Sequence, residues 1–160
     1  MQHVTFCIGT IALALTASVA IAQAPISYGP TILLESAKKA AAPALAEATR
    51  NNWAMAVAIV DTGGNLVYFE KMDGTQIGSI AVAIDKARSA ALFKRPTKAF
   101  QDTLAAGGEG LRILKIEGAV PVEGGVPLVV DGKIIGAVGV SGGTSQQDGQ
   151  CAAAGAAGLK

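Results

Sequence analysis

Residues 124–148 read GGVPLVVDGKIIGAVGVSGGTSQQD, and this stretch decides the fold. Two apolar segments, Val126–Val130 and Lys133–Val140, flank the dipeptide Asp131-Gly132. Asp-Gly is favoured in the two-residue type I′ turn, whose central residues both need positive φ. The stretch therefore predicts an antiparallel hairpin.

The end of the same stretch predicts a helix. Ser145-Gln146-Gln147-Asp148 has the form of a capping box, with a serine three residues before an acid. We therefore expect a small, alanine-rich helix that reaches about Ala157. The glycines of Ser141–Thr144 let the last strand turn into it, and we prefer this role to phosphate binding because no Gly-Lys-Ser/Thr follows.

A second hairpin is predicted upstream. Trp53–Val60 and Leu66–Lys71 are strand-like and are joined by Asp61–Asn65, where Gly and Asn favour a turn. Acidic residues flank both hairpins, and we assign them to turn structure rather than to acid–base or metal chemistry: Asp61, Asp73, Glu117 and Glu123.

Helical periodicity predicts the remaining elements. Thr31–Arg50 and Ser79–Phe93 carry apolar residues at helical spacing, and Pro43 should bend or split the first. A short helix should run from Pro96 to about Ala105, while residues 111–116 fit either a strand or a helical turn. The sequence thus predicts one domain with a mostly antiparallel sheet and helices on its faces.

The first residues have the layout of a secretory signal peptide. Residues 4–21 are almost entirely apolar or small, and Ala20-Ile21-Ala22 is a small-x-small cleavage pattern. We expect a signal peptide over residues 1–22, a single domain over residues 23–160, and a periplasmic or secreted protein. The alternative is an uncleaved anchor, although the apolar stretch is barely long enough to span a bilayer.

Composition excludes several classes of function. Thirteen basic and twelve acidic residues give a net charge of +1, too little for binding a long nucleic acid. The one histidine, His3, lies in the predicted leader, so Ser/His/Asp hydrolysis is excluded and no catalytic residue is assigned. Cys151 is the single cysteine after residue 22, which rules out an intramolecular disulfide. Abundant Ala and Gly suggest close-packing faces between subunits, so we expect a homo-oligomer.

Three stretches resemble one family. They are residues 58–67 followed by Lys71-Met72-Asp73-Gly74, residues 79–90, and residues 124–128 with 135–143 and Asp148. The chain thereby resembles the GlcG/HbpS family, which also occurs as the C-terminal domain of PduO-type corrinoid adenosyltransferases. The resemblance implies an α/β (α+β) fold, a profilin-like three-layer domain with a five-stranded antiparallel sheet flanked by helices. It also implies oligomeric assembly and haem binding, with haem degradation in some members.

The resemblance directs attention to the region of the central helix. Lys86 and Arg95 could meet the two propionates of a haem, and the hydroxyl of Thr97 could approach the iron. Other candidate iron ligands are Tyr68, Met55, Met72 and Cys151. The alternative for the cations is a solvated helix face near Asp85.

Two functions remain open at this point. The first is an exported haem-binding protein that stores, senses or degrades haem. The second is a non-haem protein, either an oligomeric accessory protein or an enzyme acting on a small organic acid. The family and the predicted export favour the first, whereas the absence of histidine after residue 22 favours the second.

Overall fold

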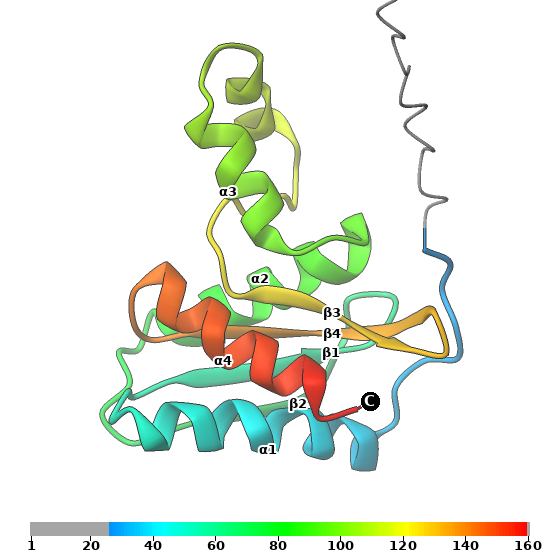
Figure 1. Ribbon diagram of the computed structural model, residues 1–160, viewed down its shortest axis with the longest axis vertical. Helices are drawn as coiled ribbons and strands as arrows, with labels where there is room; N and C mark the ends of the chain where they lie inside the picture. Colours follow the sequence, from blue (N-terminus) through cyan, green and yellow to red (C-terminus); the bar gives the residue numbers. More distant parts are fainter. Residues whose placement is uncertain (1–25, 160) are drawn as a thin grey trace, which may run out of the picture.

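The central sheet has four strands. The computed structural model describes residues 26–159, so the predicted signal peptide, residues 1–22, lies outside them. Strands β1 (Ala56–Val60), β2 (Leu66–Lys71), β3 (Gly125–Val130) and β4 (Lys133–Ser141) form one antiparallel sheet in the order β2-β1-β4-β3 (Figure 1). Both hairpins are confirmed, and Asp131 and Gly132 have the positive φ values of 49° and 70° expected for the type I′ turn.

The expectation of a fifth strand is wrong. The N-terminal segment meets the sheet through a single parallel bridge, Tyr28 to Ile134. Pro30 follows two residues later and has no N–H to continue a ladder of hydrogen bonds. The Ile32 N–H still donates to the Ile135 carbonyl oxygen at 2.8 Å, but the segment then continues into the first helix instead of adding a strand.

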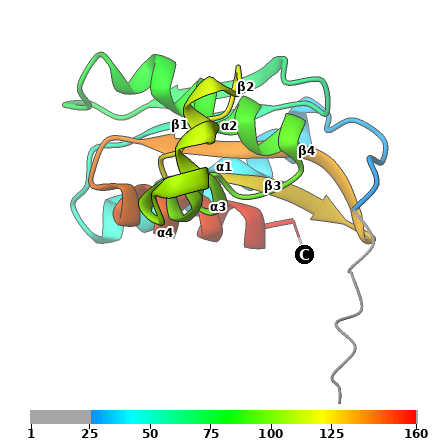
Figure 2. The same cartoon turned by 90° about the horizontal axis from the view of Figure 1, so that it is seen from above.

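Helices cover both faces of the sheet and make three layers. α2 (Ser79–Phe93) packs on one face, while α1 (Leu34–Arg50) and α4 (Ser145–Ala157) pack on the other (Figures 1 and 2). The mixed α/β class with an antiparallel sheet is therefore confirmed. None of the helices within residues 26–159 has the length and apolar character needed to cross a membrane.

α1 is not split at Pro43, contrary to one of the two outcomes expected. The helix runs continuously from Leu34 to Arg50 with Pro43 inside it. Alanines on both sides of the proline are buried, among them Ala40 and Ala44, so both halves are held against the core. Gly158 packs beside the proline, where an added Cβ would lie 2.7 Å from Pro43 Cγ and 3.0 Å from the Lys39 carbonyl oxygen. Small residues thus accommodate the proline.

The Ala- and Gly-rich faces are used inside the chain. A Cβ added to Gly139 of β4 would lie 2.0 Å from the Ala83 carbonyl oxygen of α2, so only glycine permits this approach. Ala83 and Ala87 of α2 are fully buried against the sheet. The small residues that suggested subunit contacts therefore account for close packing of helix on sheet within one chain.

The sheet with α1, α2 and α4 is here called the body. Residues 97–122, here called the arm, project from it (Figure 1). The arm contains α3 (Thr97–Ala105) and a 3₁₀ helix, η1 (Gly108–Lys115), which resolves the ambiguity over residues 111–116 in favour of a helical turn. α3 packs mainly on η1. Leu111, Leu114 and Ile116 remain exposed on the arm.

Candidate functional site

Lys86 forms a buried ion pair at the centre of the molecule. Its side chain is 1% exposed, and Nζ donates hydrogen bonds to Asp148 Oδ2 at 2.6 Å and to the Val140 carbonyl oxygen at 3.2 Å. The pair connects α2 with α4 across the end of β4. Lys86 is therefore neither on a solvated helix face nor free to meet a propionate in this conformation. Arg88, on the outer side of α2, is the residue that lies beside Asp85, at 4.0 Å.

Asp148 is the site residue that sequence reasoning misassigned. The capping box at the start of α4 is formed by Thr144 and Gln147, one residue earlier than predicted, which leaves Asp148 free to point inward. Its Oδ1 accepts a hydrogen bond from the Gly143 N–H at 3.1 Å. Burial raises the pKa of Asp148, and the pairing with Lys86 and the nearby backbone N–H groups oppose that rise.

A signal for this inward position exists in the sequence. Asp148 shares helical spacing with Cys151, Ala152 and Gly155, and all four residues are buried. An acid on the apolar stripe of a helix needs a buried counter-charge, because an unpaired buried carboxylate is costly. Lys86 is the matching cation.

Two glycines allow the chain to pass over this ion pair. A Cβ added to Gly124 would lie 2.9 Å from Lys86 Nζ, and one added to Gly125 would lie 2.3 Å from the Lys86 carbonyl oxygen. Gly124 also has a φ of 127°, which side-chain-bearing residues rarely adopt. The Gly124-Gly125 segment therefore fits only as glycine.

Thr97 joins the arm to this segment. It is fully buried, and its Oγ1 accepts a hydrogen bond from the Gly125 N–H at 2.9 Å. The structure thus brings two of the three predicted residues, Lys86 and Thr97, against the same pair of glycines. In this arrangement the Thr97 hydroxyl is enclosed and supports the backbone.

Arg95 is the third predicted residue, and its charged group is accessible. It is exposed between α2 and α3, and within residues 26–159 it forms no salt bridge. Its Nε donates to the Phe93 carbonyl oxygen, and its Cζ lies 5.5 Å from the centroid of the Phe100 ring. Phe93 and Phe100 pack edge to face at 5.3 Å. A cation beside an aromatic pair suits an acidic ligand with an apolar body.

Two of the remaining candidate ligands, Met55 and Cys151, are enclosed in this conformation. Met55 and Cys151 are fully buried, and burial, with Glu47 and Asp148 nearby, raises the pKa of Cys151 to about 11, so it is a thiol at neutral pH. The Tyr68 hydroxyl donates to Glu70, and this bond raises the tyrosine's pKa. Met72 is half-buried beside β1. Within residues 26–159 there is no group of three His, Cys, Asp or Glu residues that could hold a metal.

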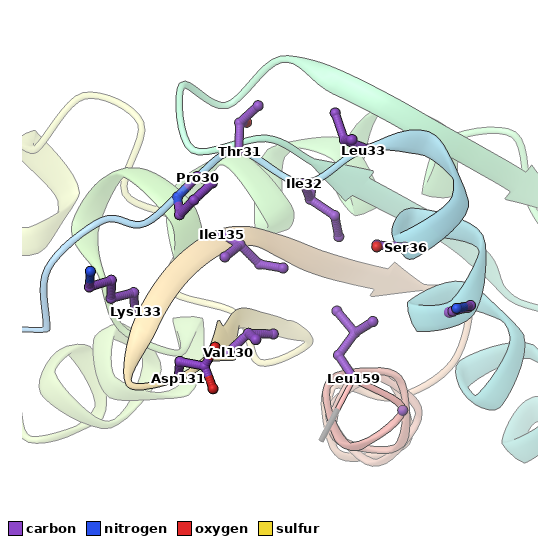
Figure 3. A pocket seen from close by; sticks show the side chains of 12 residues that line it. Pro30, Thr31, Ile32, Leu33, Ser36, Val130, Asp131, Lys133, Ile135 and Leu159 are labelled. Carbon is purple, nitrogen blue, oxygen red and sulfur yellow. The ribbon is translucent and has the colours of Figure 1, made fainter.

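A cavity lies away from these residues. It has a volume of about 750 Å³ and opens between the start of α1, the turn that joins β3 to β4, and the end of the chain (Figure 3). A smaller hollow of about 410 Å³ lies on the outer side of α2, beside Arg88 and residues 117–120 of the arm. Neither cavity includes Lys86, Arg95 or Thr97.

Comparison with known proteins finds the same family as the sequence resemblance. The family model described as haem degrading protein HbpS-like matches residues 32–157. Protein GlcG of Escherichia coli K12 is 41% identical over 95 residues, which are 59% of this chain and 69% of GlcG.

Solved structures match over most of the chain. A double mutant of HbpS from Streptomyces reticuli has a TM-score of 0.75 at 30% identity and covers 92% of this chain and 99% of its own. The complex of PduOC with haem has a TM-score of 0.72 at 26% identity and covers 81% of this chain and 96% of its own. The resemblance predicted from the sequence is therefore confirmed.

Proposed function

The chain belongs to the HbpS-like family, and from this premise we propose that it is a haem-binding protein. The observation that carries the proposal is the match of residues 32–157 to the family model, together with the likeness to a structure solved with haem. The accessible guanidinium of Arg95 beside Phe93 and Phe100 supports it, because a haem propionate is an anion attached to a flat apolar ring.

The proposed site is the junction of α2 and α3. Arg95 faces a propionate there, while Thr97 is a positioning residue that holds Gly125 at the base of the arm, and Lys86 is one that holds Val140 and Asp148. A direct role for Lys86 requires the ion pair with Asp148 to open, and a role for Thr97 as iron ligand requires its bond to Gly125 to break. Both roles therefore stay predictions, and the following experiment tests the one for Thr97.

A haem titration of the full chain followed by visible spectroscopy tests this function. We expect a Soret shift for the wild type and a loss of affinity of about tenfold to a hundredfold for Arg95→Gln, as for a lost charge-assisted hydrogen bond. Arg112→Gln is the matched control, because Arg112 is an exposed arginine on the arm that pairs with Glu109. A Soret band that moves in Thr97→Val but not in Thr97→Ser would assign the iron ligand to Thr97.

Two results would contradict the proposal. A wild type that never develops a Soret shift rejects haem, and the alternative then stands, a non-haem oligomeric accessory protein or an enzyme acting on a small organic acid. Equal affinities for wild type and Arg95→Gln would keep haem but remove it from the α2–α3 junction.

Export and assembly complete the proposal. The apolar residues 4–21 and the Ala20-Ile21-Ala22 pattern support a periplasmic or secreted protein, whose intact mass should correspond to a chain that starts at Gln23.

The exposed apolar residues of the arm support a homo-oligomer. Light scattering under reducing conditions should give a mass several times that of one chain, and a monomer at micromolar concentration would reject the oligomer.

A further inference from the structure

The cavity at the start of α1 has no part in the proposed haem site. Three separate segments form it, the entry to α1, the β3–β4 turn and the C-terminal residues Gly158 and Leu159 (Figure 3). Its volume of about 750 Å³ falls within the range of small-molecule sites. It therefore has the size of a ligand site.

The inner wall of the cavity is apolar. Ile32, Ile135 and Leu159 point toward its centre from the three segments (Figure 3). Gly158 packs against Pro43 of α1, where an added Cβ would collide with the proline ring. This close approach places the next residue, Leu159, at the cavity. Such a wall suits a hydrocarbon chain.

Polar groups lie at the two ends and differ in charge. At the α1 end are the Ser36 hydroxyl and Lys39, one helical turn apart, and the N-cap residue Leu33 offers the first turn no side-chain hydrogen bond. At the other end Lys133 shares the hairpin turn with Asp131. Within residues 26–159 neither lysine forms a salt bridge. The α1 end is therefore the positive end, without an acid among the residues that line it.

We propose that this cavity binds a linear aliphatic monocarboxylate. Its chain lies against Ile32, Ile135 and Leu159, and its carboxylate meets Lys39 and Ser36. The inference is independent of haem, because it rests on a different cavity and a different cation.

Calorimetric titration of the full chain with octanoate, decanoate and dodecanoate, each below its micelle concentration, tests the apolar part. Burial of each added CH₂ should strengthen binding by about fourfold. Decanol supplies the same chain without the charge, and it should bind about tenfold more weakly than decanoate because it lacks the charge-assisted bonds. Equal affinities across the acids, or for decanol and decanoate, would overturn the proposal.

Variants test the placement. Lys39→Gln should weaken decanoate about tenfold. Lys38→Gln is the matched control, because Lys38 is the neighbouring lysine but pairs with Glu35 at 3.1 Å and does not line the cavity. Leu159→Trp should narrow the cavity at its apolar wall and weaken all three acids while leaving the sheet intact. Similar losses in Lys38→Gln and Lys39→Gln would reject the site.

The same variants separate this inference from the haem proposal. Lys39→Gln should leave haem affinity unchanged, and Arg95→Gln should leave decanoate affinity unchanged. If Lys39→Gln weakens haem and decanoate competes with haem, the cavity holds haem and the monocarboxylate inference fails. If haem does not bind at all and decanoate still does, the haem proposal fails alone.

Discussion

The body and the arm of this molecule differ in which apolar residues they bury and which they expose. Where α2 meets β4, alanines and Gly139 are buried so tightly that one added Cβ would strike backbone. On the arm, Leu111 and Leu114 are 53% and 63% exposed. The abundance of alanine and glycine suggests faces that pack closely between subunits. Within the chain these alanines and glycines pack helix on sheet, while the two leucines lie exposed on the arm, so small residues here indicate how closely elements approach one another.

The largest loss in the free energy of unfolding should come from breaking the buried ion pair between Lys86 and Asp148. Lys86→Met leaves the Asp148 carboxylate buried without its counter-charge, and we expect the free energy of unfolding to fall by about 3–5 kcal/mol. Chemical denaturation measures it. The double variant Lys86→Met/Asp148→Leu removes both charges and should recover most of the loss. A single variant as stable as wild type would show that the pair does not hold the body together.

An intermediate effect is expected at the joint between body and arm. Thr97→Val removes the acceptor for the buried Gly125 N–H, so the free energy of unfolding should fall by about 1–3 kcal/mol. Thr97→Ser keeps the hydroxyl and serves as control in the same denaturation experiment. A valine variant as stable as wild type would show that this hydrogen bond does not stabilise the joint.

The smallest effect should be found on the arm itself. Leu114→Ser changes a mostly exposed side chain, and we expect the free energy of unfolding to change by less than about 0.5 kcal/mol. Leu128→Ala, in the fully buried part of β3, should cost about 2–5 kcal/mol in a parallel thermal or chemical melt. An arm variant as costly as the core variant would mean that Leu114 is covered in solution.

Local patterns were enough to predict most of the fold. α2 and β2 have the predicted bounds, and Asp131-Gly132 forms the predicted turn, because periodicity and turn chemistry act over a few neighbouring residues. The fifth strand came from the family resemblance, and it is wrong because the N-terminal segment forms only the bridge Tyr28 to Ile134 and Pro30 interrupts the ladder with β4. The family itself is confirmed.

The site was less accessible to sequence reasoning, because its members are far apart in the chain. Lys86 and Asp148 are 62 residues apart, and nothing local to Lys86 indicates that its charge is buried. Asp148 matched a capping motif whose true members are shifted by one residue, Thr144 and Gln147. Arg95 was predicted as a candidate cation, but its contact with Phe100 depends on the direction of α3, which the local sequence does not give.

The antiparallel pairing of β1 with β4 limits how much of the sheet can form while the chain is still being synthesised. A nascent chain that has reached residue 130 contains β1 and β2, yet the second neighbour of β1 has not been synthesised. At that point Lys86 has no counter-ion and Gly139 is not there to receive α2. The centre therefore cannot be completed before β4 and Asp148 have been synthesised. Until they emerge, β1 lacks one of its two neighbouring strands and Lys86 lacks its counter-charge.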